Sequence, residues 1–349
     1  HFLGALNLLN YGHFQKEILP MHSILVSIGE IPISLGLSMG AEQFAGIIQF
    51  SSLLSLIPIF FKKKQNKLFL IAILACPITL FLVSSPKPQL LYSITTLLIF
   101  IFLIDNFKKL KNSDIKLFFL IGLFLMAIAF IAKYSFILSS TLLLTYSYLI
   151  LLKKKIIFSP IIIGISVFII TILPYWIFRS QNFGIDFINL FTSPLPLNVY
   201  GYKNMHDSLS GGSINLVSLI LPPSLGKFTN TYGPLFLILI FLMNDKILKY
   251  KFPLGIITTY ILCVCIFGSS LNRFLYEGYL WLIFLISITY NKKTIIYNFF
   301  TKIIFLQSFV ILLISLFYVI TIFPGSLNEN YKKKVMIKNA NGYQLASWT

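Results

Sequence analysis

Long, continuous apolar runs recur along almost the whole chain of 349 residues. Runs of about 17 to 22 residues match the length that a helix needs to cross the hydrocarbon core of a bilayer. Strands of a membrane barrel would instead alternate in hydrophobicity, and these runs do not. With 57% hydrophobic and only 11% charged residues, the chain has too few charges to keep a soluble surface in water. The sequence therefore predicts an all-α, polytopic integral membrane protein.

Ten apolar segments are predicted to be transmembrane helices. Their ranges are 42–61, 68–84, 89–106, 116–132, 135–152, 156–177, 231–243, 252–268, 275–290 and 303–323.

Lysine clusters alternate with these segments and set the orientation. Of the 28 basic residues, 17 lie in the connections after the first, third, fifth, seventh and ninth segments. The positive-inside rule places those connections in the cytoplasm. The net charge of +18 is thereby explained by topology, and we expect no nucleic-acid partner. These lysines are Lys62, Lys63, Lys64, Lys67, Lys108, Lys109, Lys111, Lys116, Lys153, Lys154, Lys155, Lys246, Lys249, Lys251, Lys292, Lys293 and Lys302.

The same alternation divides the chain into regions. Residues 1–41 form part of a first non-cytoplasmic loop, whose apolar stretch Ile31–Met39 is too short to span and is expected to lie along the membrane or re-enter it. Residues 42–323 form the transmembrane domain, which includes a large external loop at 178–230. Residues 324–349 begin a non-cytoplasmic C-terminal segment. Functional chemistry is expected on this non-cytoplasmic side.

The sequence lacks the motifs that mark disulfide frameworks, metal sites and the active sites of common soluble enzymes. The cysteines Cys76, Cys263 and Cys265 lie in apolar segments, which argues against a disulfide framework or a zinc site. The four histidines lack metal-ligand spacing, and no nucleophile triad or phosphate-binding glycine loop is present. The sequence requires no cofactor and predicts no metal site, while a divalent-metal requirement stays open.

Four basic residues at external helix ends are candidate phosphate contacts. Lys87 lies in a short turn, where a solvated, snorkelling lysine is the alternative. Lys133 lies in a hairpin with little other polar cover, and a charge in such a place tends to face a cavity. Arg179 follows interfacial aromatics, so that a lipid-headgroup anchor is its alternative. Arg273 can hold two phosphate oxygens with its planar fork, and Asn272 beside it adds a donor. Such groups at one face suit an anionic lipid headgroup.

The external acidic residues are expected to be solvated or ion-paired, and Glu277 is one of them. Glu30 differs because it lies among apolar residues, where burial or a neighbouring cation would set its protonation state.

Several short passages, in this order, resemble the GT-C superfamily of membrane glycosyltransferases that use polyprenyl-phosphate sugars, which includes the protein mannosyltransferases and aminoarabinose transferases. Gln89 stands where the family commonly has Asp, Ser180 replaces an Asn, and Glu277 stands in a region usually occupied by Pro. The matching passages are 1–12 with Pro20 and Glu30, then 86–91, 132–135, 173–184 and 272–275.

The resemblance implies transfer of a sugar from a polyprenyl-phosphate donor to an acceptor of unknown class at the non-cytoplasmic face of a bacterial inner membrane. It implies that the catalytic Asp lies upstream of His1, so that the chain is a fragment truncated at both ends, with Glu30 and His1 as supporting groups. Basic side chains would bind the donor phosphate, and four further residues would contact substrate. The phosphate ligands are Lys87, Lys133, Arg179 and Arg273, and the substrate contacts are Tyr134, Asn182, Asn272 and Tyr276.

Two other functions stay open. A transporter or flippase of lipid-linked oligosaccharides also needs charged groups in a cavity among helices, but it would show paired repeats and discontinuous helices. The sequence shows no such repeat. A polymerase or ligase of surface polysaccharide also has a large external loop with arginines, and the sequence separates it poorly from a transferase.

Overall fold

The fold is entirely helical in the part of the chain that the computed structural model describes. This confirms the all-α prediction, and the apolar helices long enough to cross a bilayer make it a membrane protein. The described residues are 8–12, 28–41, 43–61, 67–85, 89–105, 112–153, 155, 158–184, 186–187, 216–222, 230–243, 245–267, 272–290 and 295–339.

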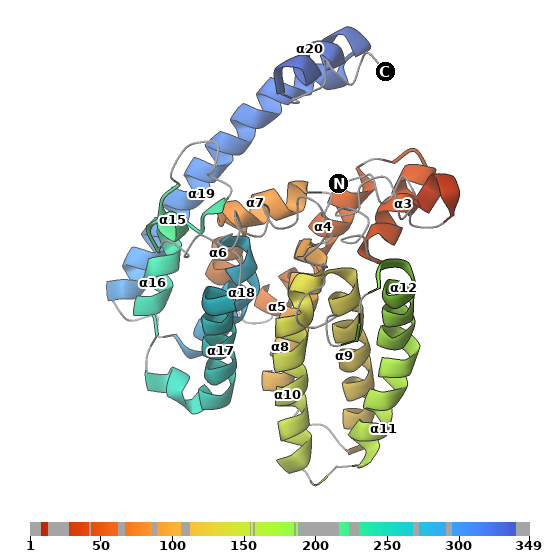
Figure 1. Cartoon of the computed structure of the whole chain (residues 1–349). Coiled ribbons are helices and arrows are strands. Elements are labelled where there is room, and N and C mark those ends of the chain that lie inside the picture. Colours follow the sequence, from red (N-terminus) through yellow and green to blue (C-terminus); the bar gives the residue numbers. More distant parts are fainter. Residues whose placement is uncertain are drawn as a thin grey trace.

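One group of helices stands side by side in the yellow and green part of the ribbon (Figure 1). In this group α9 packs against α8, α10 and α11, and α10 also contacts α8. Its members are α8 (Gln89–Asp105), α9 (Asn112–Ala132), α10 (Ile137–Lys153), α11 (Phe158–Val167) and α12 (Leu173–Phe183).

A second group lies beside the first and contains the most buried helix. In it α18 packs against α6 and α17, and α19 packs against α6 and α16. Contacts of α18 with α8 and of α17 with α10 join the two groups. The members are α6 (Lys67–Leu74), α7 (Pro77–Ser84), α16 (Leu235–Phe241), α17 (Lys251–Phe267), α18 (Tyr276–Thr289) and α19 (Ile295–Ile322).

Helix α18 is apolar on nearly all sides, which is the pattern of a helix surrounded by protein. All of its residues from Tyr276 to Ser287 are buried. Trp281 stacks on Phe100 of α8 at 5.3 Å between ring centroids and lies 5.1 Å from the ring of Tyr260 in α17. This short helix therefore forms the centre of the bundle. The topology predicted from the sequence would put its first turn at the non-cytoplasmic end.

The predicted span 68–84 is broken into α6 and α7, which meet at 65°. Pro77 begins α7 because its ring has no N–H to continue the α6 ladder. Three side chains donate hydrogen bonds to backbone carbonyls near the break. Gln307 donates to Ala75 O at 2.8 Å, Thr79 to Ile73 O at 2.7 Å and Tyr279 to Ala72 O at 3.3 Å. Backbone that leaves helical geometry inside a membrane protein needs such partners.

A smaller irregularity lies between α11 and α12. The π-helical turn η3 (Phe168–Ile172) precedes Pro174, whose missing N–H prevents an ordinary helical hydrogen bond. The chain nevertheless continues as one apolar segment, 160–181, long enough to cross a bilayer.

The N-terminal elements form a tight helical hairpin before the first group. The turn η1 (Ile28–Glu30) leads into α3 (Ile31–Ser38), and α4 (Phe44–Leu54) and α5 (Ile57–Phe61) follow. A Cβ on Gly36 would lie only 2.6 Å from the Cβ of Phe44, so glycine permits the close crossing of α3 and α4. The apolar stretch that is too short to span is thus a separate eight-residue helix.

Each of the ten predicted spans contains a helix, but ten full spans are not present in the residues described. Five helical segments among those residues are long and apolar enough to cross a bilayer, and α6 and α7 together make a sixth if they are counted as one span. Helices α8 and α10 are apolar but shorter, and α16 covers only Leu235–Phe241 of the predicted span 231–243. The five segments are 44–61, 115–132, 160–181, 245–266 and 295–326.

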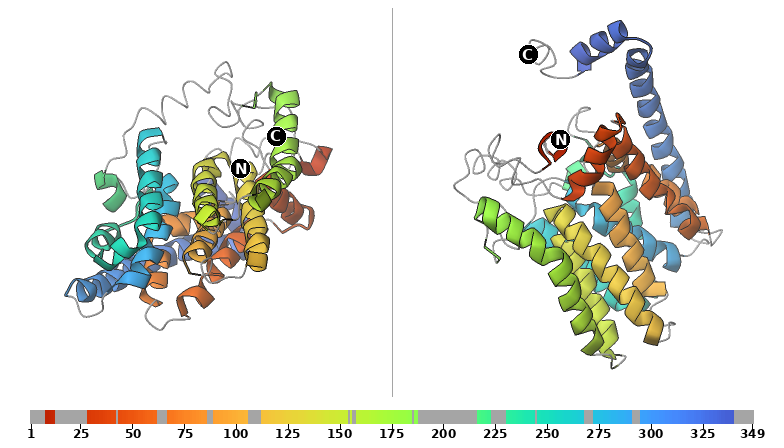
Figure 2. Two further views of the ribbon diagram at one scale, coloured as in Figure 1. Left: turned by 90° about the horizontal axis from the view of Figure 1, so that it is seen from below. Right: turned by 90° about the vertical axis from the view of Figure 1, so that its right-hand side faces the viewer.

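The C-terminal part projects from the bundle. Helix α19 runs up one side and α20 (Glu329–Asn339) lies across its end, well away from α8 to α12 (Figure 2). A short 3-10 turn, η7 (Phe323–Ser326), joins them. Helix α20 is exposed and lysine-rich, and Lys332 pairs with Glu329 at 3.4 Å on its surface. The polar segment predicted after residue 323 therefore begins as a helix.

Candidate functional site

Lys133 directly follows α9 and reaches the first residue of α8. Its backbone N–H donates to Ala129 O at 3.1 Å, which extends the helical hydrogen bonding by one residue. Its Nζ donates to Gln89 Oε1 at 2.6 Å, and Gln89 is only 3% exposed. Lys133 is thus paired with a neutral, buried acceptor at the start of α8.

Glu277, in the first turn of α18, is a buried carboxylate rather than a solvated one. It is 5% exposed, and it accepts hydrogen bonds from Thr96 Oγ1 at 2.8 Å and from the Tyr260 hydroxyl at 3.0 Å. It also interacts electrostatically with Lys133. Because Thr96 lies in α8 and Tyr260 in α17, the carboxylate joins both helix groups.

The two hydroxyls that contact Glu277 have more hydrogen-bond acceptors within reach than hydrogens to donate. Thr96 Oγ1 also lies 2.9 Å from Ser93 O, and the Tyr260 hydroxyl lies 2.7 Å from Phe274 O. Each hydroxyl has one hydrogen to donate, so neither can serve both acceptors fully. A buried cluster with excess acceptors favours a nearby cation, which here is Lys133. The polar cluster of Gln89, Thr96, Lys133, Tyr260 and Glu277 is hereafter called the Glu277 cluster.

Arg273 lies one helical turn before Glu277, in η6 (Asn272–Leu275). Its guanidinium stands over the ring of Phe274 with Cζ 5.5 Å from the ring centroid, and its Nε is buried. Burial lowers the pKa of this guanidinium from its ordinary value. Among the residues that the structure describes, the Arg273 side chain makes no hydrogen bond or ion pair, so its planar fork is available to a ligand.

Arg179 lies in the last turns of α12 and is only 2% exposed. Its Cζ is 5.7 Å from the centroid of the Tyr175 ring, which in turn lies 6.5 Å from the ring of Phe130 in α9. This packing places Arg179 at the same end of the first helix group as Lys133. A headgroup anchor would face lipid, so the burial of Arg179 favours a role inside the protein.

Two predicted substrate contacts have structural partners. The Asn272 side-chain amide donates to Ser218 O at 3.1 Å and to Asn230 O at 2.9 Å, and the backbone carbonyl of Asn272 accepts from the Tyr232 hydroxyl at 2.8 Å. These bonds hold together the two described parts of the loop before α16. Tyr276 is fully buried, with its hydroxyl 2.8 Å from Thr79 Oγ1 at the broken helix. Their substrate roles remain predictions.

The remaining candidates are only partly described. Glu30 is half-buried at the end of η1, which packs against α9, and it interacts electrostatically with Tyr92 of α8. Tyr134 and Asn182 lie in η2 (Tyr134–Phe136) and α12, but their side chains are outside the described part. Lys87 and His1 also lie outside the described residues. No group of metal-ligating side chains occurs in the part of the chain that the structure describes.

The structure thus brings Lys133 to Glu277 and puts Arg273 a turn away. Sequence reasoning overlooked Glu277, Thr96 and Tyr260, because it treated the acid as an ordinary surface carboxylate. A signal was nevertheless present: Glu277 follows Arg273 by one helical turn and then enters an uninterrupted apolar segment. A carboxylate in such a position must find partners within the protein.

No curated protein and no solved structure matches the chain. A protein family matches it over residues 1–336, which is nearly the whole length. The chain belongs to the family described as the DUF1420 N-terminal domain.

Proposed function

We propose that this protein is a glycosyltransferase of the GT-C type that transfers a sugar from a polyprenyl-phosphate donor to an acceptor at the non-cytoplasmic face of a bacterial inner membrane. The single observation that carries the proposal is the half-buried Arg273, whose guanidinium makes no hydrogen bond or ion pair to described residues. A desolvated arginine one turn from a buried, lysine-linked carboxylate is suited to an anionic headgroup.

In this proposal the basic groups stabilise the leaving phosphate. Arg273 binds two phosphate oxygens with its fork, Lys133 supplies a second positive charge, and Arg179 and Lys87 contribute from neighbouring helix ends. As the bond between the sugar and the phosphate breaks, negative charge grows on the phosphate, and cations placed beforehand lower that barrier. The acceptor attacks the anomeric carbon and gives its proton to a carboxylate base, with Glu30 and His1 in support.

The finer topology belongs to the same proposal. Ten spans with the lysine-rich connections in the cytoplasm would put Lys133, Arg179, Arg273 and the large loop 178–230 on one external face. The first turn of α18 and the last turns of α9 and α12 would then line the donor site. Tyr134, Asn182, Asn272 and Tyr276 would surround the sugar.

The test is sugar transfer by the full-length protein reconstituted in vesicles. A panel of polyprenyl-phosphate hexoses and pentoses is offered with membrane lipids and glycans as acceptors, and release of polyprenyl phosphate is measured. We expect release from at least one donor, with a loss of about tenfold or more in Arg273→Ala and Lys133→Ala, because each removes a charge-assisted contact. Lys153→Ala, at the opposite end of α10, is the matched control and should keep full activity. Equal activity in all variants would refute the phosphate-binding roles.

A flippase or transporter is the second candidate, and the broken α6–α7 helix favours it because transporters use discontinuous helices to hold ions or substrate. Against it, the carbonyls of Ala72, Ile73 and Ala75 already accept hydrogen bonds from side chains. Movement of an unmodified lipid-linked glycan across vesicles, without release of polyprenyl phosphate, would support this candidate. A polysaccharide polymerase or ligase would release the carrier only with a glycan acceptor.

A further inference from the structure

The apolar segment made of α11, η3 and α12 has a stripe of exposed residues that changes its spacing at the π-helical turn. Before the turn these residues are three and four apart, as on one face of an α-helix, and the same holds after it. Between the two sets, from Ile169 to Pro174, the spacing is five. The stripe consists of Ile162, Ile165, Ile169, Pro174, Ile177 and Gln181, and Ile161, Ser166 and Ile170 widen it before the turn.

The change of spacing has a cause in the backbone. The N–H of Leu173 donates to Phe168 O, five residues back, whereas an α-helix would pair it with Ile169 O. The next residue, Pro174, has no N–H, and its ring would clash with Ile170 O in an uninterrupted α-helix. The wider π-turn moves that carbonyl away from the ring, and it does so by holding one residue more than an α-helical turn.

The extra residue rotates α12 by about 100° relative to α11. Val167 and Arg179 show the effect, because they are 4% and 2% exposed and so lie on the inward side before and after the turn. They are twelve residues apart, which in an uninterrupted α-helix would separate them by about 120° around the axis. The extra residue reduces this angle to about 20°. Without the π-turn, Arg179 would therefore point sideways, to the edge of the lipid-facing side.

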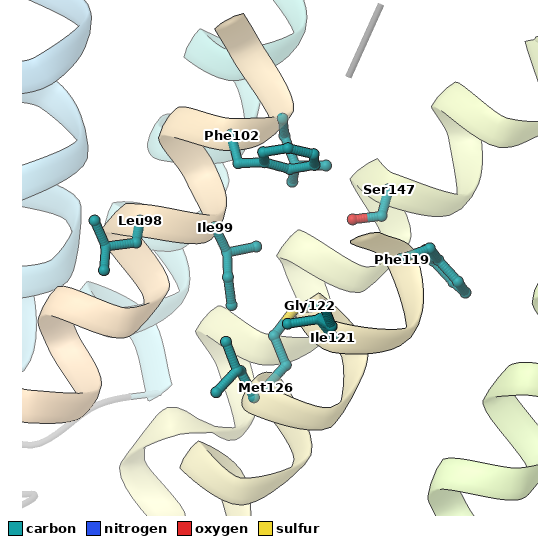
Figure 3. Close-up of a pocket in the computed structure, with 10 residues that line it drawn as sticks. Leu98, Ile99, Phe102, Phe119, Ile121, Gly122, Met126 and Ser147 are labelled. Carbon is teal, nitrogen blue, oxygen red and sulfur yellow. The ribbon is translucent and has the colours of Figure 1, made fainter. Parts of the chain in front are cut away.

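An inward arginine needs polar surroundings, and only one end of the first helix group supplies them. Farther along the group, the cavity of about 150 Å³ between α8, α9 and α10 is apolar (Figure 3). Its one polar side chain is Ser147, whose hydroxyl is already bonded within α10. Arg179 instead stands over the ring of Tyr175, which packs edge-on against Phe130, three residues before Lys133. The rotation thus places this charge at the polar end of the group.

We infer that the π-turn is a positioning device, in which one extra residue, required by Pro174, sets the rotation of α12 so that Arg179 faces the interior beside Lys133. Pro174 itself touches no substrate and acts through Arg179. Thr171 supports the turn from the inward side, since its hydroxyl donates to Val167 O at 2.6 Å. The rotation follows from the geometry alone, whereas the use of Arg179 on a phosphate rests on the proposed function.

Two variants separate the rotation from the mere loss of a proline. Pro174→Ala supplies the missing N–H, so that the segment can close as a continuous α-helix with α12 turned by about 100°. Deleting Ile170 in the same chain removes the extra residue, and the continuous helix then carries Arg179 back to the inward side. Pro160→Ala is the matched control, because Pro160 lies in the first turn of α11, where no helical hydrogen bond depends on its N–H.

Trp176 reports the rotation directly. Its ring lies 5.5 Å from that of Phe187 and packs against the buried pair Phe130 and Ile131. Turning α12 by about 100° would carry this ring to the lipid-facing stripe. The full-length protein is placed in nanodiscs of brominated phosphatidylcholine, which quenches tryptophans that face lipid.

Trp348→Phe is included in every variant, so that the fully buried Trp281 gives a constant background. We expect Pro174→Ala to raise the quenching of Trp176 to that of a lipid-facing reference, Ile177→Trp combined with Trp176→Phe. The double variant and Pro160→Ala should be quenched no more than the unmodified protein. Unchanged quenching in Pro174→Ala would overturn the inference.

Sugar transfer from the panel of polyprenyl-phosphate donors is the functional readout. Pro174→Ala should lower it about tenfold, the loss expected for one charge-assisted contact, and deletion of Ile170 in that chain should restore it. A proline with a purely structural role would not be rescued by removing a further residue. A double variant that folds and transfers sugar when Pro174→Ala does not fold would support the inference. A double variant without recovery in either readout would overturn it.

Failure of the two proposals can be told apart. Quenching that rises in Pro174→Ala and falls again in the double variant, in a protein that transfers no sugar, would support the rotation and refute the glycosyltransferase. Full transfer by Pro174→Ala while Trp176 turns to lipid would refute the positioning of Arg179 and leave the glycosyltransferase standing.

Discussion

Replacing Gln307 with Met should strongly destabilise the fold, although Met has nearly the same size. Gln307 is 8% exposed inside α19, and its amide forms hydrogen bonds to two separate parts of the chain. Its Nε2 donates to Ala75 O at 2.8 Å and to Tyr232 O at 2.9 Å, and its Oε1 accepts from Leu235 N at 3.2 Å. One side chain therefore connects the broken α6–α7 helix to the start of α16.

The magnitude follows from the three backbone groups that lose this partner. A buried group left without a hydrogen bond costs about 1–3 kcal/mol, which gives an upper figure near 9 kcal/mol. Side-chain hydrogen bonds in membrane proteins average only about 0.6 kcal/mol each, because the unfolded state in the membrane also finds partners, which gives a lower figure near 2 kcal/mol. We expect a loss of about 2–6 kcal/mol in the free energy of unfolding.

The assay is reversible unfolding in mixed micelles titrated with SDS and followed by tryptophan fluorescence. Trp281, which is fully buried in α18, is a suitable reporter. Gln43→Met, at the exposed start of α4, is the matched control and should change the unfolding free energy by less than about 0.5 kcal/mol. A Gln307→Met loss below about 1 kcal/mol would show that this amide does not hold the broken helix in place.

Other predictions follow from neighbouring contacts. Gly233→Ala should cost about 2 kcal/mol or more in the same unfolding assay, because Gly233 has φ +81° and an added Cβ would lie 2.6 Å from Gln307 Oε1, whereas Gly255→Ala should be neutral. Glu277→Leu should lower the free energy of unfolding by less than about 1.5 kcal/mol, because Thr96 and Tyr260 keep Ser93 O and Phe274 O as acceptors. It should nevertheless lower sugar transfer, because Lys133 loses the carboxylate that positions it. A large loss of stability would contradict this prediction. Arg273→Lys should leave unfolding unchanged and lower transfer about tenfold, since lysine cannot form the bidentate contact, and full activity would refute that geometry.

The sequence was sufficient to predict the helices because their apolar length has one physical explanation. The sequence did not, however, distinguish one predicted span from another, whereas the structure separates them into lipid-facing helices and helices enclosed by protein. Helix α18 shows the reason: a helix of 14 residues surrounded by other helices need not match the bilayer thickness. Hydropathy alone does not distinguish these two environments.

The breaks were harder to predict because their partners are distant in sequence. Pro77 signals an interruption, but its accommodation depends on Gln307, which bonds to Ala75 from a separate helix. For the same reason the sequence suggested Lys133 and Arg273 as site residues but missed Glu277. Charge at a helix end is visible locally, whereas the partners of a buried carboxylate come from α8 and α17.

The central claim is that Lys133 and Arg273 bind a lipid-linked phosphate, and direct binding of polyprenyl phosphate tests it most closely. Native mass spectrometry of the full-length protein released from phosphatidylcholine nanodiscs can compare the unmodified protein, the double variant Lys133→Ala/Arg273→Ala, and Lys153→Ala. The account predicts binding to the unmodified protein and to Lys153→Ala. It predicts affinity lower by about a hundredfold or more in the double variant, from two lost charge-assisted contacts. Equal affinity in all three proteins, or no binding to any of them, would contradict it.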